Sequence, residues 1–301
     1  MKKIKLLLGI FALLSTVFVF GQQDTQYTQY MYNMNVLNPA YAGSKGITSI
    51  GLLGRSQWVG VDGAPQTLTL SIHSPIGNQV GLGLSVVHDE IGPVKEDNIY
   101  VDFSYTILTS EEGRLAFGLK GGVTFLDVRE TIMVDDLDPL NVPIHQTSPN
   151  FGAGIYFYTN KFYVGLSAPN FLETRHLEKD GGQSSSAAEQ MHYFFTSGYV
   201  FDINENLKLK PSTMIKATSG APLSVDLSTN LLVEDRFEFG LSYRFDDSIS
   251  GMVGFQVNED FRIGYAYDHT ISSYGEFNSG SHEIMLLFDF NRRNIKSPRF
   301  F

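Results

Sequence analysis

Apolar and polar residues alternate almost strictly along many stretches of this chain between Thr48 and Phe290. In the stretch 236–245, phenylalanine, leucine or tyrosine occupies every odd position, and arginine, glutamate, glycine or serine occupies every even position. Successive side chains of a β-strand point to opposite faces, so this pattern predicts strands with one apolar and one polar face. The stretches 98–108 and 260–269 repeat it. The sequence therefore predicts an all-β fold.

We predict fourteen strands in this region, and most have roughly the nine to eleven residues that a tilted strand needs to cross a bilayer. Their ranges are 46–57, 66–74, 79–88, 98–108, 113–125, 150–159, 161–168, 191–202, 206–216, 222–233, 236–245, 249–258, 260–269 and 281–291. Short connections such as 234–235 alternate with long ones such as 169–190. Transmembrane barrels have this asymmetry, because their periplasmic turns are short and their external loops are longer.

Alternation and unequal connections together predict an antiparallel transmembrane β-barrel over residues 46–291, in contact with outer-membrane lipid. An even number of strands places both mature termini on the periplasmic side. A soluble β-sandwich or a β-solenoid also contains half-buried alternating strands and is the alternative. Those two folds explain less well why the apolar face is so rich in aromatic residues.

The polar face of the predicted strands carries charges of both signs, such as Asp102, Lys120 and Glu238. Inside a barrel, such charges brace a filled lumen or line a selective pore. Glycines such as Gly81 and Gly118 weaken a strand in solution, but in a barrel they allow a luminal chain segment to approach closely. Relief of crowding at a bend is the other interpretation of these glycines.

Residues 1–21 have the pattern of a secretory signal peptide. Three lysines precede an apolar run from Leu6 to Phe20, and Val19 and Gly21 fit a cleavage site before Gln22. A membrane-anchor helix is the alternative, but the apolar run is short and no charged stop-transfer segment follows it. We therefore expect an exported protein whose mature chain begins at Gln22.

Composition narrows the function of the mature chain. Without the three lysines of residues 1–21, the chain has 19 basic and 32 acidic residues, which argues against nucleic acid as a partner. Cysteine is absent from the sequence, which excludes disulfide bridges, thiolate metal sites and cysteine nucleophiles.

Two segments flank the predicted barrel. Residues 22–45 contain four tyrosines and many amides but do not alternate. They suit a luminal plug or docking strand, or alternatively a periplasmic lead-in packed under the barrel, and Asn38-Pro39 favours an extended or turning start rather than a helix. Residues 292–301 form a basic tail, which is either solvated or in contact with a periplasmic partner.

The sequence contains no recognisable catalytic or cofactor-binding motif. His88-Asp89-Glu90 and Ser281-His282-Glu283 contain residue types that a hydrolase uses, but they lie where strands meet loops and more simply make polar rim contacts. Five acids between Asp127 and Asp138 could attract calcium, although no twelve-residue calcium loop is present and a solvated acidic loop is the simpler interpretation. We expect no enzyme activity, no cofactor and no metal site.

Several motifs resemble one family across the whole mature chain. They include Leu37-Asn38-Pro39-Ala40-Tyr41-Ala42-Gly43-Ser44, Arg55-Ser56-Gln57-Trp58-Val59-Gly60 and Gly280-Ser281-His282-Glu283-Ile284-Met285-Leu286. These segments are similar to those of the PorP/SprF family of Bacteroidetes outer-membrane proteins. The Asn-Pro-Ala-Tyr-Ala-Gly and Ser-His-Glu segments are specific to that family rather than general features of β-barrels.

The resemblance implies a role with the type IX secretion system, in which the barrel helps particular cargo reach or stay on the cell surface. Implied partners are secretion components and a secreted surface protein with a C-terminal sorting domain, such as an adhesin, which in gliding species serves motility. Candidate partner-binding residues are Tyr30, Asn38, Pro39, Tyr41, Arg55, Trp58, Asp135 and Asp136. A channel or transporter for small solutes is the alternative function.

Overall fold

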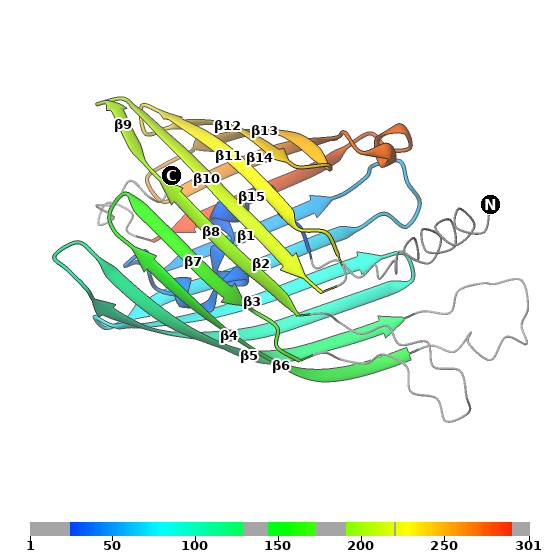
Figure 1. Cartoon of the computed structure of the whole chain (residues 1–301), viewed down its shortest axis with the longest axis horizontal. Helices are drawn as coiled ribbons and strands as arrows, with labels where there is room; N and C mark the ends of the chain where they lie inside the picture. Colours follow the sequence, from blue (N-terminus) through cyan, green and yellow to red (C-terminus); the bar gives the residue numbers. More distant parts are fainter. Residues whose placement is uncertain (1–24, 129–143, 173–190, 220, 291–301) are drawn as a thin grey trace, which may run out of the picture.

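A computed structural model describes residues 25–128, 144–172, 191–219 and 221–290 of the chain. One antiparallel sheet curves round and closes on itself through the pairing of β10 with β11 (Figure 1). The strands are β1 (Ser49–Ser56), β2 (Gln66–Ile76), β3 (Val80–Ile91), β4 (Val94–Leu108), β5 (Arg114–Val128), β6 (Ile144–Tyr158), β7 (Phe162–Ala168), β8 (His192–Tyr199), β9 (Phe201–Asn204), β10 (Leu207–Thr218), β11 (Ser224–Val233), β12 (Phe237–Arg244), β13 (Ser248–Gln256), β14 (Phe261–Thr270) and β15 (Ser281–Asp289). The predicted barrel is thereby confirmed, and the sandwich and solenoid alternatives are wrong.

Strands β8 and β9 occupy one position in the barrel wall. Only Val200 separates them, and both pair with β10. The wall therefore has fourteen strand positions, as predicted, and β9 extends the predicted strand 191–202 beyond the end of its neighbour β7. An ion pair of 2.7 Å between Lys161 and Asp202 fastens this extension to the β6–β7 turn. The hydrogen bond to Asp202 raises the pKa of Lys161.

Two ends of the barrel differ in their connections. We call one end the short-turn end, where the connections are 77–79, 109–113, 159–161, 205–206, 234–236 and 257–260. We call the other the long-connection end, where they are 57–65, 92–93, 129–143, 169–191, 219–223, 245–247 and 271–280. The β14–β15 connection contains a short 3-10 helix, η3 (Ser273–Glu276).

Alternation along each strand separates an outer apolar face from an inner polar face. On β12, Phe239 is 52% exposed and Leu241 is 65% exposed, whereas Glu238 between Phe237 and Phe239 is 4% exposed. Because a folded chain leaves so large an apolar surface uncovered only when it meets another partner or lipid, this face suits hydrocarbon. The predicted inward positions Asp102 and Lys120 are buried, as expected.

Four strands extend further at the long-connection end than the sequence predicted. We expected strands 79–88 and 98–108 to be joined by a loop, but β3 and β4 continue to a tight turn at Gly92-Pro93. Strands β5 and β6 are longer at this end in the same way. Polar residues such as His88 and Asp97 occupy the outer face here and contact each other at 2.7 Å, so the alternation stops although the backbone pairing continues.

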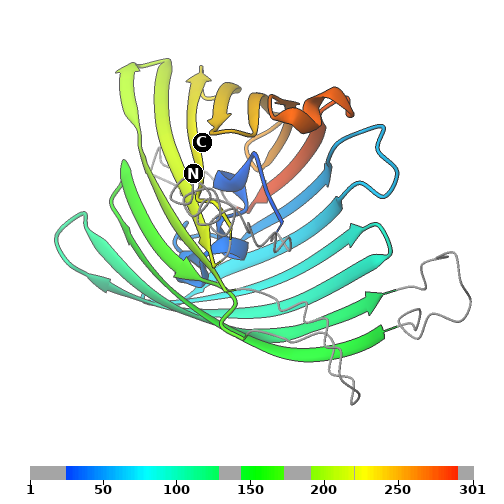
Figure 2. The ribbon, with the colours of Figure 1, turned by 45° about the vertical axis from the view of Figure 1, so that its right-hand side comes forward.

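Residues 25–48 lie inside the barrel, and we call them the luminal segment. Figure 2 shows this part of the chain, in dark blue, enclosed by the curved wall. It contains η1 (Tyr30–Tyr32), α2 (Met34–Leu37) and η2 (Pro39–Tyr41). The core forms where its side chains pack against Tyr156, Tyr163 and Phe194 of the wall. In the described part of the chain, none of the helices has the length and apolar character needed to cross a bilayer.

Candidate functional site

The contact surface between the luminal segment and the barrel wall is the candidate functional site. The segment starts near the long-connection end, where Gln26 meets Arg244 at the end of β12. It finishes at the short-turn end, where the Lys45 ammonium contacts Asp289 at 2.8 Å and Ser49 at 3.0 Å. The described chain thus passes through the lumen from one end to the other.

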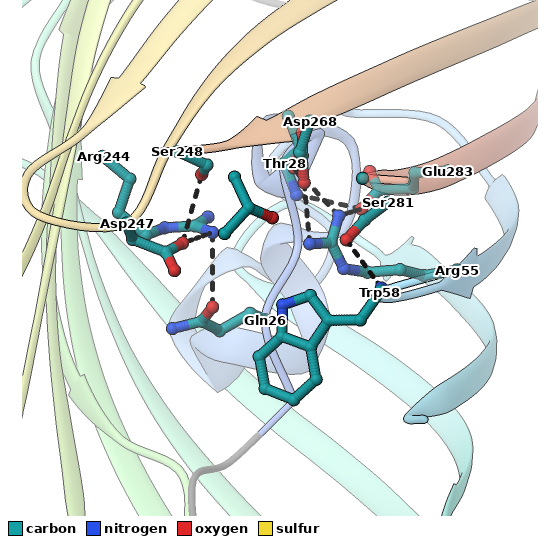
Figure 3. Close-up of polar contacts among 12 residues, drawn as sticks. Gln26, Thr28, Arg55, Trp58, Arg244, Asp247, Ser248, Asp268, Ser281 and Glu283 are labelled. Carbon is teal, nitrogen blue, oxygen red and sulfur yellow. Dashed lines mark hydrogen bonds and ion pairs between the residues drawn. The ribbon is translucent and has the colours of Figure 1, made fainter. Parts of the chain in front are cut away.

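A buried cluster around Arg55 fixes the first residues of the segment (Figure 3). Its guanidinium group lies 2.7 Å from Asp268 and 3.1 Å from Glu283. The Glu283 carboxylate also accepts hydrogen bonds from the backbone N–H groups of Thr28 (2.9 Å) and Gln29 (2.7 Å). The Thr28 hydroxyl donates to Asp268 at 2.7 Å. Strands β1, β14 and β15 therefore hold the segment through one charged network.

Arg244 makes a second fixed point at the same end. Its Nε donates to Asp226 at 2.6 Å, and its Nη1 donates to Asp247 at 3.1 Å and to Gln26 at 3.2 Å. Figure 3 shows Arg244 and Gln26 joined by this hydrogen bond, beside the Arg55 cluster. One arginine thereby joins β11, β12 and the segment.

Towards the short-turn end, Tyr32 lies between charged side chains of β12 and β14. Its hydroxyl donates to Glu238 and accepts from Arg262 at 3.1 Å. Arg262 also donates to Glu238 at 3.2 Å, and Asn230 donates to the same carboxylate at 2.6 Å. Each charge in this cluster has an opposite charge or a hydrogen-bond partner, as buried charges require.

On the opposite wall, Asp102 and Lys120 form a fully buried ion pair of 3.1 Å. The Asn35 side chain donates to Asp102 at 3.0 Å, and its backbone carbonyl accepts from Lys120 at 3.5 Å. Of the two readings of the inward charges, bracing a filled lumen describes these contacts better than lining an open pore.

Asn38-Pro39-Ala40 is the turn by which the segment crosses the barrel. Asn38 is extended, its Oδ1 accepts the backbone N–H of Ala40 at 2.9 Å, and its Nδ2 donates to the Ile155 carbonyl at 3.1 Å. Side-chain capping of this kind, with proline in the first turn, starts the short helix η2. Asn38 is extended as predicted, but the expectation of no helix here is wrong, because η2 begins at Pro39.

Glycines in the wall allow this turn to approach the strands closely. A Cβ atom added at Gly118 would lie 2.1 Å from the Ala40 nitrogen, and one added at Gly81 would lie 2.1 Å from the Ala42 oxygen. Both separations are shorter than any real contact, so only glycine fits. The predicted close approach of a luminal chain segment at these two glycines is confirmed.

The candidate residues named from the sequence fall into three places. Tyr30, Asn38, Pro39, Tyr41 and Arg55 are buried where the segment meets the wall. Tyr30 donates to Ser212 at 3.2 Å, and the Tyr41 ring packs edge-on against Tyr156 at 5.4 Å. Trp58 lies apart from them, at the mouth of the long-connection end, and Asp135 and Asp136 lie outside the described residues.

Sequence reasoning missed the partners that complete these clusters. The sequence does not single out Thr28, and it indicates Glu283 only as part of the Ser-His-Glu segment, without a role in holding the luminal segment. The inward alternation of β15 could have indicated Glu283, but no pattern reveals which residue of the segment it binds. Ser281 and His282 do not act together, because Ser281 accepts from the Trp58 N–H at 3.2 Å and His282 contacts Tyr265 on the outer face at 2.6 Å.

A cavity of about 60 Å³ remains between the luminal segment and strands β3 and β4. Its lining includes Thr25, Leu37, Asp89, Glu96 and Asn98. Among the described residues, no group of three or more histidines, aspartates or glutamates is placed to hold a metal ion. Most of the acidic stretch considered for calcium lies outside the described residues.

The sequence matches a family profile described as "Type IX secretion system membrane protein PorP/SprF" over residues 19–288. The chain belongs to the PorP/SprF family. This match confirms the resemblance drawn from the Asn-Pro-Ala-Tyr-Ala-Gly and Ser-His-Glu segments. No curated protein sequence gives a significant match.

Solved outer-membrane barrels share the fold of this PorP/SprF family member. The CymD monoaromatic hydrocarbon channel is 12% identical with a TM-score of 0.51, and the alignment covers 90% of this chain and 94% of CymD. The Ralstonia pickettii toluene transporter TbuX is 10% identical with a TM-score of 0.50, covering 85% of this chain and 92% of TbuX. At these identities the likeness concerns the fold, and the chain is an outer-membrane β-barrel.

Proposed function

We propose that this barrel is a non-enzymatic accessory of type IX secretion that helps a specific surface protein to be secreted or anchored. The family assignment supports a place among the membrane proteins of that system. By extension of the family resemblance, the cargo is a surface protein with a C-terminal sorting domain, such as an adhesin, and in a gliding bacterium it serves motility. Residues 1–21 act as the export signal in this proposal. The end of β15 is periplasmic in it, whereas the first described residues lie near the opposite end of the lumen.

The filled lumen is the observation that carries the proposal. The luminal segment makes hydrogen bonds to charged side chains on both sides of the barrel, on β4, β5, β12, β14 and β15. Its Lys45 also forms a buried ion pair with Asp289. A barrel that serves solute passage needs a continuous aqueous path, whereas a barrel that serves protein partners can do so with its lumen occupied.

Mild-detergent purification from the native envelope tests the proposal. We expect secretion components and one dominant surface protein to co-purify with the full chain. Deleting the gene should remove that surface protein from the cell surface and leave uptake of small solutes unchanged. Recovery of neither a secretion component nor a surface protein would count against the accessory role.

A channel for small solutes is the second candidate. It is favoured by the shared fold with CymD and TbuX, whose titles describe a monoaromatic hydrocarbon channel and a toluene transporter. Discrete conductance steps of the purified full chain in planar bilayers, together with lower solute uptake in the deletion strain, would support this function instead.

A further inference from the structure

Two connections at the long-connection end are fastened together, and we call them the rim: residues 57–65 between β1 and β2, and residues 271–280 between β14 and β15. The Val59 N–H donates to the Gly280 carbonyl at 2.9 Å, and the Ser279 N–H donates to the Val59 carbonyl at 2.8 Å. The Trp58 N–H donates to Ser281 at 3.2 Å, as Figure 3 shows. These bonds within the chain fix the backbone of the rim.

Trp58 has a backbone conformation that bulky residues avoid. Its φ angle is 44°, in the left-handed region that glycine adopts without strain. Strain of this kind persists only where the surroundings fix it, and it gathers at functional sites. The Trp58 indole stacks on Tyr274, with ring centroids 5.8 Å apart and an interplanar angle of 13°.

The rim presents large apolar side chains to solvent on an ordered backbone. Phe277 is 75% exposed and Tyr274 is 65% exposed. Their backbone is held by the Phe277 N–H, which donates to the Tyr274 carbonyl at 3.1 Å, and by the Asn278 side chain, which donates to the same carbonyl at 2.6 Å. Rigid aromatic anchors of this kind contribute most of the binding energy in protein interfaces.

Charge on the rim indicates which partner it fits. Asp62 and Glu276 lie on the rim, and Asp246 and Asp247 lie in the β12–β13 turn, whose Asp247 carbonyl accepts the Ile271 N–H at 2.8 Å. Residues 57–65, 245–247 and 271–280 contain no lysine or arginine. Such a surface repels anionic lipid headgroups and attracts a basic polypeptide.

We propose that the rim is a docking surface for a polypeptide segment in which an aromatic or branched apolar side chain is flanked by lysine or arginine. Tyr274 and Phe277 contact the apolar side chain, while Asp62 and Glu276 pair with the flanking cations. The inference rests on the proposed function, since it names the kind of partner segment that the accessory recognises.

Fluorescence of Trp58 tests the docking directly, because it is the one tryptophan in the sequence. The purified full chain in detergent is titrated with a short synthetic peptide that carries a central phenylalanine between lysines and arginines. We expect a saturable change in Trp58 emission, and about a tenfold weaker affinity for Phe277→Ser and for Glu276→Lys. The matched control Phe171→Ser alters another exposed aromatic residue at the same end, outside the rim, and should bind like the unchanged chain.

Three results would overturn the inference. One is an equal response to a peptide in which glutamates replace the basic residues. Another is unchanged peptide affinity in both rim variants. The third is the same emission change with phosphatidylglycerol vesicles and not with the peptide, which would make the rim a lipid contact.

Co-purification from the envelope separates this inference from the proposed function. If the unchanged chain recovers its partner and Phe277→Ser and Glu276→Lys recover it equally well, the rim is not the docking surface and the accessory role stands. If the unchanged chain recovers no secretion component or surface protein, the accessory role itself fails.

Discussion

Single buried charges decide how firmly the luminal segment is held. Arg55 and Glu283 are almost completely removed from solvent, and each neutralises the other in a network that also includes Asp268. A buried charge that loses its partner destabilises a protein strongly, because the remaining charge is neither hydrated nor paired. The Glu283 carboxylate also binds the luminal segment directly, since two backbone N–H groups of the segment donate to it.

Glu283→Gln keeps the shape of the side chain and removes its charge. We expect it to lower the free energy of unfolding by about 3 kcal/mol, within the range found for broken buried ion pairs. Urea unfolding of the detergent-solubilised barrel measures the change. Glu276→Gln, on the exposed rim, is the matched control and should change stability by less than about 0.5 kcal/mol. Equal losses in both variants would contradict the role assigned to the cluster.

Gly118 tests the close contact between the segment and the wall. Gly118→Val should displace the segment, because even its Cβ atom would overlap the Ala40 nitrogen. Gly121→Val on the same strand is the control, since a Cβ there meets only the Phe151 ring at 3.8 Å. The chain has no cysteine, so maleimide labelling of an added Ser44→Cys reports on that position alone. We expect faster labelling with Gly118→Val and not with Gly121→Val.

At the scale of elements, the helices of the luminal segment depend on the barrel. Each contains three or four residues, fewer than an isolated helix needs in water. Their geometry comes from contacts with the wall, such as Asn38 with the Ile155 carbonyl and Ser167 with the Leu37 carbonyl at 2.7 Å. The conformation of the luminal segment therefore depends on the barrel around it.

Removal of residues 25–44 tests whether the luminal segment closes the lumen. We expect no conductance from the full chain in planar bilayers and steady conductance from the shortened chain. Retarded gel mobility of the unheated sample shows whether the shortened barrel has closed. Steady conductance of the full chain would contradict a filled lumen, as would an intact shortened barrel that conducts no ions.

Strand positions could be predicted from the sequence much better than the contacts of the site. Alternation locates a strand and its faces, as it did for Phe239 outward and Glu238 inward. It gives no information on which wall residue meets which residue of a non-repeating segment, so the pairing of Thr28 with Glu283 could not be predicted. Alternation also fails at the long-connection end, where β3 and β4 continue with polar residues on both faces.

Across the whole molecule, the outer apolar face determines where the protein can exist. Phe237, Phe239 and Leu241 on β12 are exposed together, and equivalent residues continue on the neighbouring strands. Such a surface is stable against hydrocarbon and unstable against water.

Phe239→Arg places a cation on this face. We expect a loss of roughly 2–4 kcal/mol in the stability of the membrane-inserted barrel if the position is near the bilayer midplane. Folding into lipid vesicles, followed by urea titration, measures it. Phe277→Arg changes a still more exposed aromatic residue on the rim and should have a much smaller effect. Comparable losses of stability in the two variants would contradict the assignment of Phe239 to the lipid-facing surface.

The path of the luminal segment also determines the order of assembly. Thr28 is among the first described residues, yet its partner Glu283 follows 255 positions later, on the last strand. The luminal segment is synthesised early, but it can complete its contacts only after the β14–β15 hairpin has formed. Assembly therefore has to keep the luminal segment inside a partly formed barrel until β15 pairs with β1 around it.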